Sequence, residues 1–222
     1  MWRDALLVLG KDLRIERRAR VATNQVLPFA LAVLLLFGLA LGPDRTTLEG
    51  AAAGLFWVTV LFSTVLGVQR SFALETADDA ADGLRVSGLD PAGVFFGKAG
   101  ALAAQLVVLE LVLAVLAALL YGMPLSGTAL LVGSSLAATA GLCSIGMLYG
   151  VLSVGTRFRE TILPLLLLPV AAPVLLGAVK AWQAALAGAP GRGIGWLELL
   201  VVFATAYLAI GTVAFGPLLE EL

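Results

Sequence analysis

Six apolar stretches, each close to 20 residues long, make up most of this 222-residue chain. About 20 consecutive apolar residues in an α-helix are enough to cross the ~30 Å hydrocarbon core of a bilayer. These stretches are apolar on all faces, so they lack the amphipathic pattern of a helix that packs on a soluble core. We therefore predict an all-α membrane protein, with the whole chain, 1–222, as one transmembrane domain. The six predicted spans are 26–42, 51–68, 99–120, 128–152, 162–179 and 196–215.

The few polar residues exclude several classes of function. Charged residues make up 13% of the chain, and histidine is absent. Without histidine, the usual imidazole ligands of metals and haem iron and the commonest general base are missing. The single cysteine, Cys143, lies in an apolar stretch, so no disulfide framework is expected. The sequence has no Walker A, HExxH or GxSxG motif, and we expect no catalytic residue, no metal site and no tightly bound cofactor.

Basic residues are distributed unevenly between alternate connecting segments. Eleven of the fourteen lie before the first span, between the second and third, or between the fourth and fifth. The positive-inside rule therefore places both termini and residues 69–98 in the cytoplasm. Only the first twenty residues are rich in basic side chains, so nucleic-acid binding is not expected.

The first twenty residues are predicted to form a helix that lies on the membrane surface. Trp2, Leu6, Leu9 and Leu13 form one apolar stripe, and most of the basic residues lie elsewhere, where they can face anionic head groups. A cleavage site at 40–42 would make the segment a signal peptide. The charged lead of about 25 residues is long for one, so we expect the segment to be retained.

Glu110 is the one ionisable residue well inside a predicted span, and Gln105 precedes it on the same span. A charge at the bilayer centre costs several kcal/mol, so an acid here indicates a functional site by default. The alternative is a protonated acid that hydrogen-bonds a neighbouring helix, for example near Ser134, Ser135 or Thr139. The sequence leaves both readings open.

Three prolines, Pro164, Pro169 and Pro173, lie in the fifth predicted span. Each removes a backbone donor and clashes with the preceding turn, so we expect this helix to be kinked or broken. Broken helices in transporters often line a substrate path, whereas a packing kink needs no ligand.

Residues 69–98 are the longest predicted cytoplasmic connection, and several of their acidic residues lie in a helix-compatible segment. The length suggests docking to a cytoplasmic protein, and a solvated connector is the alternative. The fourth span also has a small-residue face, with Gly146 and Gly150 in the close-packing pattern of helix pairs.

The arrangement resembles the permease subunit of the cytochrome c maturation ABC transporter, the haem exporter protein B family. The resemblance covers nearly the whole chain. The most specific pieces are Arg70-x-Phe72-x-x-Glu75 at the exit of the second span, and Arg157-x-Arg159-Glu160 shortly before Leu-Pro-Leu-Leu-Leu-Leu-Pro-x3-Pro. General six-span ABC-2 type permeases share the layout without that proline pattern.

The resemblance implies a non-catalytic subunit of a bacterial cytoplasmic (inner) membrane. Two permease copies would associate with two copies of a separate cytoplasmic ATPase, whose hydrolysis of ATP would serve haem delivery or the release of a haem-loaded chaperone by a haem-handling membrane subunit. Haem would be cargo held by these partners. The coupling role would fall on seven residues of the 69–98 loop: Arg70, Phe72, Glu75, Asp78, Asp82, Gly83 and Lys98. Export of another small amphiphile and a non-transporting assembly subunit remain alternatives.

Overall fold

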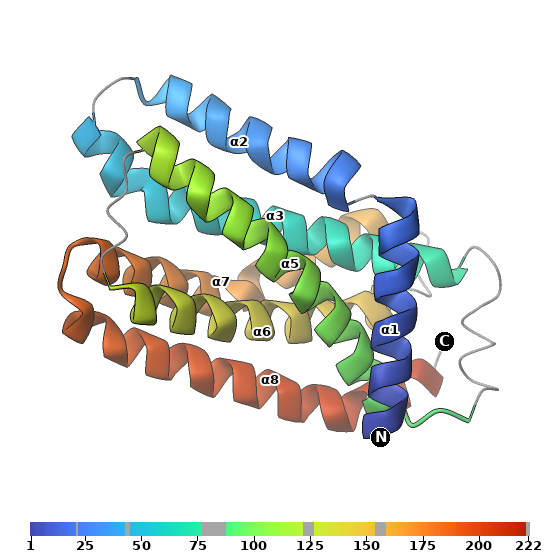
Figure 1. Ribbon diagram of the computed structural model, residues 1–222. Helices are drawn as coiled ribbons and strands as arrows, with labels where there is room; N and C mark the ends of the chain where they lie inside the picture. The colour runs from blue at the N-terminus through green and yellow to red at the C-terminus, as the bar shows by residue number, and fades with distance from the viewer. Residues whose placement is uncertain (21, 43–44, 77–87, 122–126, 154–158, 221–222) are drawn as a thin grey trace.

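The computed structural model describes residues 1–222 except 21, 43–44, 77–87, 122–126, 154–158 and 221–222. Within the described residues every regular element is a helix, which confirms the all-α prediction (Figure 1). The long helices are α1 (Trp2–Ala19), α2 (Leu27–Ala40), α3 (Arg45–Thr76), α5 (Pro91–Tyr121), α6 (Thr128–Ser153), α7 (Arg159–Leu186) and α8 (Ile194–Glu220). A π-helical turn, η1 (Ala22–Val26), precedes α2, and a short 3-10 helix, η2 (Pro190–Gly193), precedes α8.

Five of these helices, α3, α5, α6, α7 and α8, contain stretches long and apolar enough to cross a membrane. The chain is therefore a multi-pass membrane protein. The first predicted span corresponds to α2, which has 14 residues and is about 21 Å long at 1.5 Å per residue. It is preceded by α1, and the two helices meet at an angle of 55°. A sixth span is present only if this bent pair is counted as one.

Helix α6 occupies the centre of the bundle, where it contacts α3, α5, α7 and α8. In the most apolar part of α6, 67% of the residues are buried. The corresponding part of α8 has 22% of its residues buried, because α8 exposes its outer side. The glycines of the predicted packing face, Gly146 and Gly150, face Val68 and Phe72 of α3. A Cβ atom at Gly146 would lie 2.6 Å from a methyl group of Val68. Small residues at these two positions let α3 approach α6 closely.

The predicted loop 69–98 is wrong at both ends, because α3 continues to Thr76 and α5 begins at Pro91. Hydropathy identifies the stretch of residues that is apolar enough to lie in the hydrocarbon. A helix ends where its capping and backbone chemistry change. Pro91 is well suited to a first helical position, since it lacks only an amide that would have no partner there. The Asp90 carboxylate caps the helix by accepting a hydrogen bond from the Ala92 amide at 3.2 Å.

The sequence predicted that the fifth span is kinked or broken, and the structure shows no break. Helix α7 is continuous through Pro164, Pro169 and Pro173. Each proline removes one donor from the helix ladder, but the remaining hydrogen bonds and the packing of α7 against α3, α6 and α8 hold the segment helical.

Helix α1 lies across the end of the bundle where α3 ends and α5 begins (Figure 1). Its Ala5 and Val8 are buried against α5, where Gly93 and Gly97 leave room for them. A Cβ atom at Gly97 would lie 2.6 Å from Val8 Cβ and 2.7 Å from the Ala5 carbonyl oxygen. The α1 backbone therefore sits directly on the surface of α5.

An adjoining edge of α1 carries Trp2 and Leu6, which are each 68% exposed, although the Trp2 ring centre lies 5.7 Å from that of Phe96 in α5. They belong to the predicted apolar stripe, whose other members, Leu9 and Leu13, are half-buried. One helix thus has a small-residue face for α5 and an exposed apolar edge.

We expect Gly97→Ala to release α1 from α5 without disturbing the spanning bundle. The added methyl group meets a Cβ atom and a backbone oxygen, which have no freedom to rotate away, and overpacking of this kind costs about 1–3 kcal/mol. Hydrogen exchange measured by mass spectrometry should show the amides of α1 exchanging roughly tenfold faster or more. The temperature at which buried Cys143 becomes reactive to a thiol dye should change little.

Gly54→Ala is the matched control, because a Cβ atom there meets nothing within 4 Å. It makes the same change in a helix without the clash. Equal exchange of α1 in both variants would contradict the close contact between α1 and α5.

Candidate functional site

Lys98 is buried at the end of the bundle, where α1 crosses α3 and α5, although it was predicted to belong to a cytoplasmic coupling loop. Its side chain is 1% exposed, and its Nζ atom lies 3.6 Å from Asp12 Oδ2 of α1. Nζ also donates a hydrogen bond to Ser71 Oγ of α3 at 3.4 Å and lies 5.2 Å from the centre of the Phe72 ring. One ammonium group therefore connects three helices.

A second ion pair joins α1 to α3 one turn further along. Arg70 Nε lies 3.8 Å from Glu16 Oε2, and both side chains are partly buried. Asp12 and Glu16 are four residues apart on α1, so their carboxylates share one face of the helix. We call the six residues of these two contacts the polar clasp: Asp12, Glu16, Arg70, Ser71, Phe72 and Lys98.

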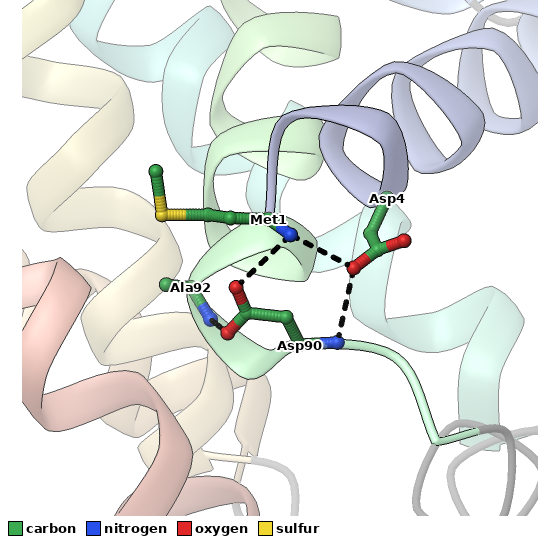
Figure 2. A network of polar contacts seen from close by, with 4 residues as sticks. All are labelled: Met1, Asp4, Asp90 and Ala92. Carbon is green, nitrogen blue, oxygen red and sulfur yellow. Dashed lines mark hydrogen bonds and ion pairs between the residues drawn. The ribbon is translucent and has the colours of Figure 1, made fainter.

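The start of α1 is held to the start of α5 by a third polar contact, shown in Figure 2. The Met1 amine lies 3.1 Å from Asp4 Oδ2 and 3.3 Å from Asp90 Oδ2. Asp4 Oδ2 also accepts a hydrogen bond from the Asp90 amide at 3.4 Å. The hydrogen bond to the Asp4 carboxylate raises the pKa of the Met1 amine. Polar contacts therefore fasten α1 at both of its ends.

The structure brings three of the seven predicted coupling residues together: Arg70, Phe72 and Lys98. Phe72 and Lys98 are each 2% exposed as whole residues, so they present little surface to a second protein. Lys98 contacts Asp12 of α1, and Phe72 lies beside Lys98 and faces Gly150 of α6. Glu75 lies in the last turn of α3. The other three predicted residues, Asp78, Asp82 and Gly83, lie outside the described residues.

Asp12, Glu16 and Ser71 are members of the clasp that sequence reasoning missed. Two acids four residues apart in a helix rich in basic residues are a usable signal, because they indicate a helix face that meets basic partners. Gly93-x3-Gly97 in α5 was a second signal, since small residues at this spacing permit close helix packing.

Glu110 is a buried acidic residue inside the bundle, and it is 6% exposed. Thr139 Oγ1 of α6 donates a hydrogen bond to Glu110 Oε1 at 2.5 Å. This is one of the helix-bridging contacts considered from the sequence. Gln105 is half-buried and lies five residues earlier on α5, which places it on another face of the helix.

A cavity of about 190 Å³ lies beside Glu110 between α5, α6 and α7. On one side Phe56 of α3 and Trp182 of α7 stack with ring centres 4.1 Å apart. Trp182 Nε1 donates a hydrogen bond to Ser135 Oγ at 3.1 Å, which orients the indole. The residues of α7 that line the cavity are Trp182 and Leu186, so the three prolines of this helix are not part of it.

We expect reversal of one charge in the clasp to loosen α1, and reversal of both to fasten it again. Lys98→Asp or Asp12→Lys alone places like charges together and removes a charged hydrogen-bonded contact, a loss of roughly 1.5–3 kcal/mol. Limited trypsin digestion should cleave α1 after Arg17 about tenfold faster in either single variant. The double variant should return most of the way to the wild-type rate.

Lys180→Asp is the control, because Lys180 is an exposed lysine of α7 outside the clasp. It changes the net charge equally and should leave cleavage of α1 unaltered. Single and double variants that digest alike would show that Lys98 and Asp12 do not act as a pair.

Known proteins are similar in sequence to this chain over nearly all of its length. The CcmB protein family model matches residues 3–221. Heme exporter protein B of Paracoccus denitrificans is 34% identical over 216 residues, covering 96% of this chain and 94% of the relative. The proteins of the same name from Pseudomonas aeruginosa and Rhodobacter capsulatus are 30% and 33% identical over 89% and 76% of this chain, and the matches cover 89% and 78% of those relatives. The chain is thus a member of the CcmB protein family.

Proposed function

We propose that this chain is a permease subunit of a haem exporter complex for cytochrome c maturation, and that it passes the motion of a partner ATPase into the membrane. The family and the names of its relatives support the haem exporter assignment. The polar clasp is the observation that carries the coupling role, because it joins the three helices that meet at one end of the bundle.

Helices α3 and α5 are longer than a bilayer requires. They have 32 and 31 residues, or about 48 and 46 Å, against ~30 Å of hydrocarbon. Residues 77–87 connect their extended ends in sequence. A protein that moves this connector displaces two spanning helices at once.

The clasp makes those ends behave as one unit with α1. Lys98 contacts Asp12 and Ser71, and Arg70 contacts Glu16, so neither α3 nor α5 can shift without straining a buried charged contact. Such contacts are costly to break. Displacement of the connector is therefore transmitted to the spans and is not absorbed by local bending.

The distribution of basic residues supports an orientation in which this end faces the cytoplasm of a bacterial inner membrane. A cytoplasmic ATPase then approaches the acidic segment that follows α3. Two permease copies and two ATPase copies make the symmetric assembly that we expect.

We expect Glu75→Lys combined with Asp82→Lys to abolish association with the ATPase while membrane insertion is retained. Reversing charges at a docking surface brings like charges together, which costs several kcal/mol of binding free energy. The complex should be extracted in mild detergent and the co-purified ATPase measured by quantitative mass spectrometry, where we expect a loss of roughly tenfold or more.

Glu49→Lys is the control on the same helix, because Glu49 lies 26 residues before Glu75 near the start of α3, about 39 Å away. It should leave the ATPase bound. Unchanged recovery of the ATPase with the double variant would refute the coupling assignment, and absence of any ATPase from the wild-type complex would favour a structural assembly subunit.

Haem ligation is assigned to partner subunits, because the chain contains no histidine. Haem titrated into the isolated chain in detergent micelles should give only a weak, non-saturating change in the Soret band. A sharp transition at one haem per chain would contradict this assignment and place the ligand site in the permease itself.

A further inference from the structure

Glu110 is buried without a basic partner among the residues that the structure describes. Its one hydrogen bond there comes from Thr139, to Oε1. Lys98 precedes it by 12 residues on the same helix, about 18 Å along the axis. A carboxylate in this setting costs several kcal/mol unless a positive charge or a proton reaches it.

The group that completes this site can enter through the cavity beside Glu110. Its volume of about 190 Å³ exceeds the ~150 Å³ of an engineered apolar cavity that takes up benzene. Phe56 and Trp182 form an aromatic wall, while aliphatic side chains of α5 and α6 form most of the remainder. The space therefore suits an aromatic ring with a small substituent.

The cavity is open on the outer side of α5 and α6. Three of its lining residues, Leu111, Val132 and Leu136, are 64%, 58% and 52% exposed, and all lie in membrane-spanning stretches. An apolar surface of this kind in a spanning helix faces lipid tails. A ligand that already partitions into the bilayer thus has the shortest route to Glu110.

We propose that this cavity is a binding site for a lipophilic organic cation, with the positive group beside Glu110 and the apolar body against Phe56 and Trp182. The carboxylate supplies charge complementarity, and aromatic rings attract a desolvated ammonium through their π-faces. A neutral apolar molecule would fill the space but leave the acid without a counter-charge. The site goes beyond the proposed coupling role, since it involves no residue of the polar clasp.

Benzyltrimethylammonium is the probe, because it carries one ring and one fixed positive charge. It should be titrated into the chain in lipid nanodiscs and followed by saturation-transfer NMR, with empty nanodiscs as background. We expect saturable binding to the wild type with a dissociation constant of about 1 mM or lower. Glu110→Gln should weaken binding roughly tenfold or more.

Two controls separate charge from fold. Glu198→Gln removes the same charge from an exposed position on α8 and should bind the probe as the wild type does. Ala114→Phe keeps Glu110 but fills the cavity from its α5 wall, and it should also weaken binding roughly tenfold. If Glu110→Gln fails to fold, Ala114→Phe still tests the site.

Two partial ligands test the two halves of the recognition. Tetramethylammonium keeps the charge without the ring, and benzyl alcohol keeps the ring without the charge, so each should bind roughly tenfold more weakly than the probe. Absence of saturable binding, equal binding by wild type and both cavity variants, or equal binding of benzyl alcohol and the cation would overturn the proposal. Each of these outcomes leaves the coupling role untouched, because that role is tested by association with the ATPase.

Discussion

A peptide group in hydrocarbon finds no hydrogen-bond partner outside its own chain, and this constraint shapes the whole molecule. Among the described residues it is met by helices throughout. Once a helix has left the hydrocarbon, nothing in this constraint forces it to stop, and α3 and α5 continue for several turns beyond the length that a bilayer requires. These extensions build one end of the bundle from the same helices that cross the membrane.

Polar chemistry is divided between two places with different physical roles. At the end of the bundle, buried charges are paired, and Lys98 holds α1, α3 and α5 in one arrangement. Inside the bundle, Glu110 adjoins a cavity and accepts a single hydrogen bond among the described residues, none of which gives it a basic partner. A paired charge stabilises one geometry, whereas an incompletely satisfied one favours a ligand. The two sites are therefore suited to motion and to binding, respectively.

The membrane class and the positions of most spans could be predicted from hydropathy, because lipid imposes a length and an apolar composition on each crossing. The helix ends could not, since Gln69–Thr76 and Pro91–Lys98 are helical through capping and packing, which hydropathy does not measure. The docking of α1 depends on which face of α5 its glycines occupy, and Gly93 and Gly97 acquire meaning only when the partner helix is known. For the same reason, the sequence suggested Thr139 among several partners of Glu110, and only the fold selects it.

The position of α1 has a consequence for the order of events during synthesis. Ala5 and Val8 leave the ribosome before the surface that receives them, around Gly93 and Gly97, which is made some ninety residues later. Until then α1 has no protein partner on α5. The exposed edge with Trp2 and Leu6 suits it to wait at the membrane surface, where aromatic and aliphatic side chains enter the head-group region. The exposed edge of α1 thus suits it to contact lipid before α5 has been made. The face with Ala5 and Val8 packs on α5 in the completed bundle.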